Sequence, residues 1–156
     1  MQSRTLFLLL PLSAALSAQT PITLTHGATR FDHNSYANST TDIGGYCNFT
    51  SSGVDHAYQS SWYYALASDA TGSAFNSSGG QLTANVSTDG RTGELVWLNV
   101  DQRNFSAVLT NAVYSTGASS GVSAQTMTIS NNTGAPLAIN IYAYVDLDIN
   151  NSFDFD

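Results

Sequence analysis

Acidic residues near the end of the chain could bind a metal ion. Asp146, Asp148 and Asn150 stand at alternate positions, and Asp154 follows shortly after them. In an extended segment, alternate side chains project from one face, and Ca²⁺ takes roughly six to eight oxygen ligands. The spacing resembles the start of a D-x-D-x-N calcium loop, although Asn151 stands where glycine is expected. The pattern predicts a calcium site, with an acidic, solvent-exposed strand face as the alternative.

A second candidate site is a set of aromatic residues in the segment Asp55–Leu66. Alternation places Tyr58, Trp62 and Tyr64 on one face of an expected strand. On an exposed sheet face, these rings would form a platform for sugar rings. The alternative is that they fill the core of the protein together with Trp97, because aromatic side chains contribute much of the burial energy there.

The histidines and the single cysteine are weaker candidates for chemistry. A nucleophilic Cys47 would need a histidine partner and a lowered pKa, and the spacing does not choose between His26, His33 and His56. A buried, unreactive thiol is the simpler interpretation, because free cysteine is among the most buried residue types. No zinc-peptidase or serine-hydrolase motif is present. We therefore expect a protein that is not an enzyme, and leave open a secreted hydrolase whose site the sequence does not reveal.

The N-terminus predicts export. Arg4 precedes an apolar run over Leu6–Leu16, and small residues follow up to Ala18. This arrangement is typical of a secretory signal peptide, and the run is too short for a membrane-spanning helix, which needs about 20 apolar residues. We expect residues 1–18 to be the leader and residues 19–156 to form one domain, secreted or displayed at the cell surface, without a transmembrane segment.

The composition excludes two classes of partner. The chain has a net charge of −7, with only four basic residues against 11 acidic ones, and it contains no lysine. Binding to nucleic acid or to an anionic membrane surface requires basic patches. We expect neither of these partners; an extracellular polysaccharide or another protein would suit the chain better.

Period-two alternation predicts the fold class. Short apolar and β-branched runs are separated by clusters of Gly, Asn and Ser, as in antiparallel β-sandwiches. Asp89-Gly90 between two such runs is typical of a β-hairpin. The expected strands, besides Asp55–Leu66, are Gln81–Ser87, Gly93–Val100, Phe105–Tyr114, Val122–Ser130 and Leu137–Ile149.

The last of these runs is the most regular. Its odd-numbered residues from Leu137 to Ile149 are apolar, whereas the even-numbered ones include Asn140, Tyr142 and Tyr144. A strand this apolar normally lies in the interior of a sheet with a partner on each side. Either the sandwich ends here or the domain continues past the end of the sequence.

Three stretches of the chain resemble a known group of proteins. They are GVDHAYQSSWYY at Gly53–Tyr64, MTISNNTGAPL at Met127–Leu137 and YAYVDLD at Tyr142–Asp148. Together they are similar to uncharacterised secreted bacterial proteins, many of which carry an exosortase-type C-terminal sorting anchor. The resemblance implies a secreted β-sandwich but no activity, and the anchor itself is absent from this sequence.

These observations favour a secreted or cell-surface structural or interaction domain. A carbohydrate-binding module is the first alternative, since it would use the aromatic strand. A secreted hydrolase is the second. The sequence names no specific ligand, substrate or oligomeric state.

The calcium site generates the first testable prediction. If Asp146, Asp148 and Asn150 share an ion, millimolar Ca²⁺ should raise the melting temperature, since a ligand in hundredfold excess over Kd contributes roughly 2.7 kcal/mol. Mg²⁺ should substitute poorly, because it demands a tighter octahedron. Asp148→Asn should remove most of the shift, whereas Asp101→Asn should leave it intact. A melting curve indifferent to both Ca²⁺ and EDTA would contradict the prediction.

Overall fold

The structure is a computed structural model, and it describes residues 22–34, 46–75 and 81–147. Strands make up most of the described chain, which also has one short 3-10 helix, η1, at Val100–Gln102. No helix in these ranges is long and apolar enough to cross a membrane. The strands are β1 (Ile22–His26), β2 (Thr29–Asn34), β3 (Tyr46–Ser51), β4 (Val54–Leu66), β5 (Ser73–Ala74), β6 (Gln81–Val86), β7 (Thr92–Trp97), β8 (Phe105–Gly117), β9 (Ser120–Asn131) and β10 (Ile139–Asp146).

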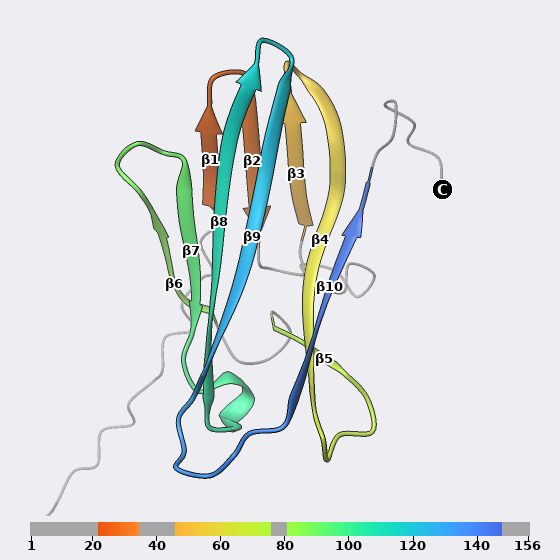
Figure 1. The fold of residues 1–156 in the computed structure, drawn as a ribbon, viewed down its shortest axis with the longest axis vertical. Helices are drawn as coiled ribbons and strands as arrows, with labels where there is room; N and C mark the ends of the chain where they lie inside the picture. The colour runs from red at the N-terminus through yellow and green to blue at the C-terminus, as the bar shows by residue number, and fades with distance from the viewer. Residues whose placement is uncertain (1–21, 35–45, 76–80, 148–156) are drawn as a thin grey trace, which may run out of the picture.

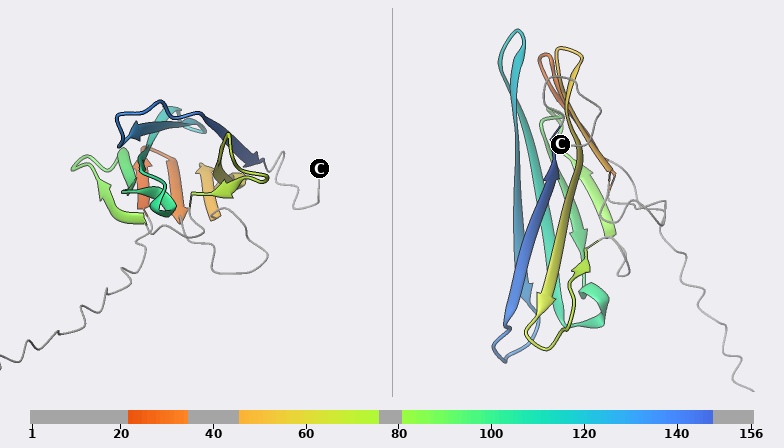
Figure 2. Two further views of the ribbon diagram at one scale, coloured as in Figure 1. Left: turned by 90° about the horizontal axis from the view of Figure 1, so that it is seen from below. Right: turned by 90° about the vertical axis from the view of Figure 1, so that its right-hand side faces the viewer.

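The strands form two antiparallel sheets that pack face to face. The first sheet has the order β1-β2-β3-β4-β10, with β5 paired to β4, and the second has the order β6-β7-β8-β9. Figure 1 shows β8 and β9 running in front of β2, with β1 to the left and β3 to the right, and Figure 2 shows the elongated body that results. The predicted antiparallel β-sandwich is confirmed.

Most predicted strands are present, within a few residues of their expected ends. Asp89-Gly90 lies in the β6–β7 turn, and Gly90 has a φ of 70°, a value that favours glycine. β1, β2 and β3 were not among the strands predicted from the sequence. These strands are short, and their polar residues, such as Asp32 and Asn48, interrupt the apolar pattern.

The expectation that the apolar strand near the C-terminus lies inside a sheet is wrong for its described part. β10 is an edge strand, paired only with β4 among the described residues. Its alternation is correct: Ile139 and Ile141 pack against the core. Farther along, Val145 and Leu147 are 48 % and 56 % exposed. The apolar face of β10 is covered by the opposite sheet at its start, and this cover ends before the strand does.

The two flanks of the sandwich differ. On one flank, β1 contacts β6, β7 and β8, and the Thr25 backbone N–H donates to the Gly90 carbonyl at 2.8 Å. On the other flank, β9 and β10 are joined by the loop at residues 132–138 and separate towards the upper end of the molecule in Figure 1. The first flank is closed, and we call the second one, between β9 and β10, the open flank.

The core at the lower end of Figure 1 is aromatic. The Tyr64 ring centroid lies 5.0 Å from that of Phe75 and 5.1 Å from that of Phe105, and Phe75 also contacts Trp97 at 5.7 Å. These rings come from both sheets and from the segment after β5. Tilted and edge-on ring contacts of this kind stabilise the packing of the two sheets at this end beyond the burial of apolar area.

A polar cluster joins the sheets near the open flank. Gln125 of β9 accepts hydrogen bonds at Oε1 from Ser60 Oγ at 2.7 Å and from Trp62 Nε1 at 3.2 Å. Its Nε2 donates to Asn111 Oδ1 at 2.9 Å, and Asn111 Nδ2 donates to the Leu109 carbonyl at 3.4 Å. Two strands of one sheet and one strand of the other therefore meet at a single amide.

This cluster generates the second prediction. Gln125→Met keeps the side-chain volume but leaves partly buried polar groups of Ser60, Trp62 and Asn111 without this partner. Each unsatisfied buried group costs about 1–3 kcal/mol, so we expect a loss of about 2–4 kcal/mol in the free energy of unfolding, measured by chemical denaturation. Thr126→Ala, at the exposed neighbouring position, should cost less than about 1 kcal/mol. A Gln125→Met variant as stable as the parent would contradict the assigned role.

Candidate functional site

The predicted calcium ligands fall largely beyond the described residues. Asp146 is exposed at the end of β10, opposite Gln59 of β4 in the register. Asp148, Asn150 and Asp154 lie outside the described ranges. Within 22–34, 46–75 and 81–147, no three His, Cys, Asp or Glu side chains form a group that could hold a metal ion. The calcium site therefore stays a prediction.

The predicted aromatic platform lies on the inner face of its sheet. Tyr64 is fully buried, and Trp62 is half-buried and packed against the core. The alternation predicted from the sequence is correct, and the face it selects is the one that meets the second sheet. The side chain of Tyr58 lies outside the described set. Tyr64 therefore belongs to the core and Trp62 packs against it, as the alternative interpretation predicted.

Tyr64 reaches a polar cluster at the lower end of the core. Its hydroxyl donates to Asp101, and the Arg103 guanidinium lies over its ring, 5.8 Å from the centroid. Burial raises the pKa of the Tyr64 hydroxyl, and the hydrogen bond to Asp101 raises it further. The hydroxyl is therefore held in its neutral, donating form. This arrangement orders the turn around η1.

Backbone strain accompanies this cluster. Asn99, Asp101, Gln102 and Asn104 all have φ values between 48° and 61°. Such left-handed conformations cost roughly 1–2 kcal/mol for a non-glycine residue, and asparagine tolerates them best. Surrounding contacts must compensate for the strain. Among these contacts are the Tyr64–Asp101 hydrogen bond and the acceptance of the Asn104 N–H by Asn99 Oδ1 at 2.8 Å.

The open flank contains a groove between the sheets. Its volume is about 270 Å³. The first sheet contributes Phe31, Cys47, Phe49, Ala57 and Ser60 to its lining; β9 contributes Ser123 and Gln125, and the β10 end contributes Val145 and Leu147. Apart from two serines and the glutamine, these side chains are apolar or a thiol, and none carries a formal charge. The groove therefore suits an apolar occupant.

Sequence reasoning did not identify this groove. Phe31, Cys47 and Phe49 belong to strands that were not predicted. The exposed end of β10 did leave a signal, because the apolar alternation continues through Val145 and Leu147 without a charged residue on that face. An edge strand with an uninterrupted apolar face needs something to cover it.

His33 is the histidine that lies across from Cys47 on the neighbouring strand. The two residues are directly opposite in the β2–β3 register and are 3 % and 1 % exposed. Burial lowers the pKa of His33 to about 4, and its hydrogen bond to the Ser60 backbone offsets this shift only in part. The neutral His33 imidazole is too weak a base to activate the thiol, and the Cys47 thiol is almost fully shielded from solvent. The pair therefore does not form a catalytic nucleophile. The arrangement agrees with the interpretation of Cys47 as a structural thiol.

The adjacent residues Asp32 and His33 do not act as a catalytic pair. Asp32 points to the outer face, where Arg30 Nε donates to it at 2.6 Å and Thr23 Oγ1 donates to it at 2.6 Å, whereas His33 is buried. Adjacent strand residues point to opposite faces, so this aspartate cannot orient its own neighbour.

Comparisons with known proteins found no matching family model, no matching curated protein and no matching solved structure. Inference about function therefore rests on the geometry of the chain itself.

Buried His33 generates the third prediction. Its folded-state pKa is lower than its ordinary value of 6.5, so the unfolded chain binds this proton more readily. Stability should be constant above about pH 6.5 and should fall between pH 6.5 and about 4, by on the order of 3 kcal/mol for a shift of this size. His33→Gln should be less stable at pH 7 but should lose this dependence, as measured by urea unfolding across the pH range. His56→Gln should keep it, because His33 remains. An equal slope in the His33→Gln variant would refute the assignment.

Proposed function

We propose that the protein is a secreted or cell-surface interaction domain that accepts an extended, positively charged segment of a partner protein at its open flank. The observation that carries the proposal is the pair of free sheet edges beside an uncharged, largely apolar groove. Among the described residues, β9 pairs only with β8, and β10 pairs only with β4. Free edges of this kind are templates for strand addition.

An added strand on the edge of β9 would cover the exposed apolar side chains at the end of β10. It would continue the second sheet, and its inward side chains would cover Val145, Leu147 and the groove. Backbone hydrogen bonds to β9 would supply affinity, and the groove would select apolar side chains at alternate positions. The twelve residues of β9 offer an edge long enough for this purpose.

The charge of the chain favours a basic partner over a second copy of itself. The net charge is −7, so two copies repel each other, whereas a Lys-rich or Arg-rich segment is attracted from a distance. The three described arginines are each in an ion pair with a nearby aspartate. Asp146, beside the groove residues Val145 and Leu147 in the chain, is exposed and appears in none of these pairs.

The fourth prediction tests strand addition with a defined probe, a peptide of about ten alternating Val and Lys residues. Hydrogen exchange should slow in β9 when the peptide binds, because the free edge amides gain acceptors. Val145→Lys should weaken binding by at least about tenfold, since it places a charge in the groove. A peptide of alternating Val and Glu should not bind.

Val122→Lys is the matched control. Val122 is 47 % exposed, against 48 % for Val145, but it lies on the outer face of β9. Both variants add the same charge, so any difference between their affinities for the peptide is due to the position of Val145 in the groove. Equal effects of the two substitutions, or no change in β9 exchange, would contradict the proposal. A concentration-dependent dimer that Val145→Lys dissociates would assign the flank to a second copy and would also overturn it.

A further inference from the structure

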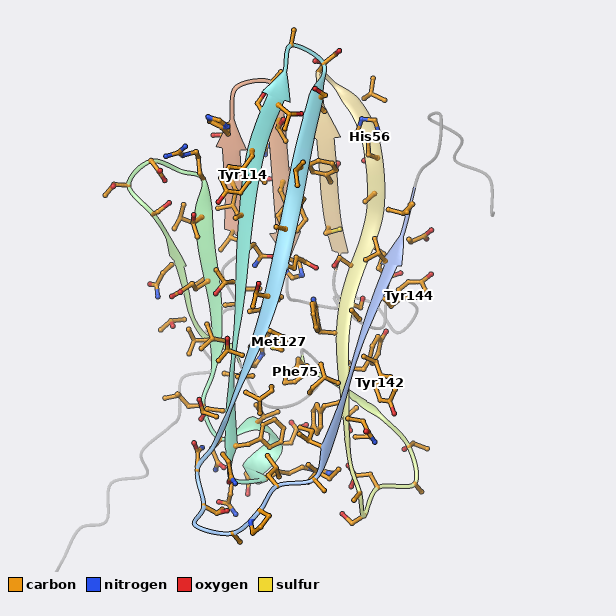
Figure 3. All side chains as sticks on the ribbon, in the orientation of Figure 1. His56, Phe75, Tyr114, Met127, Tyr142 and Tyr144 are labelled. Carbon is orange, nitrogen blue, oxygen red and sulfur yellow. The ribbon has the colours of Figure 1, made fainter. Side chains whose placement is uncertain are left out.

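The outer face of the first sheet carries a second surface with its own chemistry. In the β4–β10 register, Tyr142 lies opposite Tyr63 and Tyr144 lies opposite Ser61. Tyr142 and Tyr144 are 52 % and 49 % exposed, and Figure 3 shows them projecting outward from β10 while Phe75 and Met127 lie towards the middle of the sandwich. We call the surface formed by Tyr63, Tyr142 and Tyr144 the tyrosine face.

A hollow adjoins the tyrosine face. It has a volume of about 470 Å³, and its lining includes Tyr63, Tyr142, Asn140, the end of β4 and most of the β4–β5 loop at residues 67–72. This volume falls within the range of ligand sites, roughly 300–1,000 Å³. Two tyrosine rings thus border a space that also offers an exposed amide from Asn140 and the exposed residue Thr71.

The loop that walls the hollow is held in place. Asp69 accepts the Leu66 backbone N–H at 3.0 Å and the Arg103 guanidinium at 2.5 Å. The Ala67 N–H donates to the Ala138 carbonyl at 3.1 Å. These bonds tie the loop to β4, to the turn around η1 and to the start of β10. A wall fixed before binding reduces the entropy that a ligand must overcome.

The chemistry of this surface fits a neutral carbohydrate. A sugar ring has an apolar C–H face and a polar rim of hydroxyls, and tyrosine presents an apolar ring with a polar tip that stays in water. The Asp69 carboxylate in the wall is already paired with Arg103. The strong negative charge of the chain disfavours acidic polymers. We propose that the tyrosine face binds a neutral polysaccharide.

This inference is independent of the open flank. Tyr142 and Tyr144 occupy the even-numbered positions of β10, which face outward, while Val145 occupies an odd-numbered position that lines the groove. One strand therefore presents two surfaces, and a substitution on one face leaves the other intact. Val145→Lys should not change carbohydrate binding, so the failure of one proposal would leave the other standing.

The fifth prediction uses affinity gel electrophoresis of the full chain in soluble neutral polysaccharides, namely a β-glucan, an α-glucan, a xylan and a mannan. At least one of these gels should retard the parent protein, and an alginate gel should not. Tyr142→Ala should weaken retention by at least about tenfold in apparent affinity, whereas Tyr142→Phe should keep most of it, because the ring remains.

Tyr114→Ala is the matched control. Tyr114 is 45 % exposed on β8 of the other sheet, so its loss removes a similar exposed ring from the opposite side of the molecule and should leave retention unchanged. The melting temperature of each variant shows whether the fold is kept. Absence of retention in all four neutral gels, retention in alginate alone, or equal loss in the Tyr114→Ala and Tyr142→Ala variants would overturn the assignment.

Discussion

The amide of Gln125 is the contact on which the open flank depends. The closed flank is held by β1 packing against three strands of the second sheet, whereas no comparable contact closes the flank at β9 and β10 in the described part of the chain. There, hydrogen bonds from Ser60 and Trp62 to Gln125 join the sheets directly. Each hydrogen bond contributes only about 1 kcal/mol to the free energy of folding. A polar bridge inside a sandwich therefore contributes more to the register and spacing of the sheets than to net stability.

Because the sheets are held together at Gln125, the groove beside this bridge can stay open without the fold collapsing. Gly121 of β9 contributes to the same geometry, since a Cβ there would overlap the Thr29 side chain of β2. The second sheet thus approaches the first closely near the tip of β9 and again at Gln125. The groove lies beside this pair of contacts, and its shape is a property of the framework rather than of a loop.

The arrangement of the strands explains which features could be predicted from the sequence and which could not. Alternation fixes which residues share a face, so the fold class and the two faces of β10 could be predicted. Alternation does not say which face is inside when both carry aromatic residues. The sequence therefore left open whether Trp62 and Tyr64 form an exposed platform or pack in the core, while Tyr142 and Tyr144 were assigned to the opposite face of their strand without a role. Strand order is set by long-range pairing, so the edge position of β10 and the Cys47–His33 pairing carried no local signal.

An exposed apolar edge normally promotes aggregation, and charge is one way in which proteins suppress it. Here the chain has 11 acidic residues against four basic ones, and none of the acidic residues occupies an inward position of β10. Repulsion at long range disfavours pairing between identical copies through the exposed apolar surface of Val145 and Leu147. The same field attracts a cationic segment. Under the proposed function, global acidity combined with a locally uncharged groove would select a cationic partner without a charged residue in the groove. This selection would weaken as salt screens the field over about 10 Å.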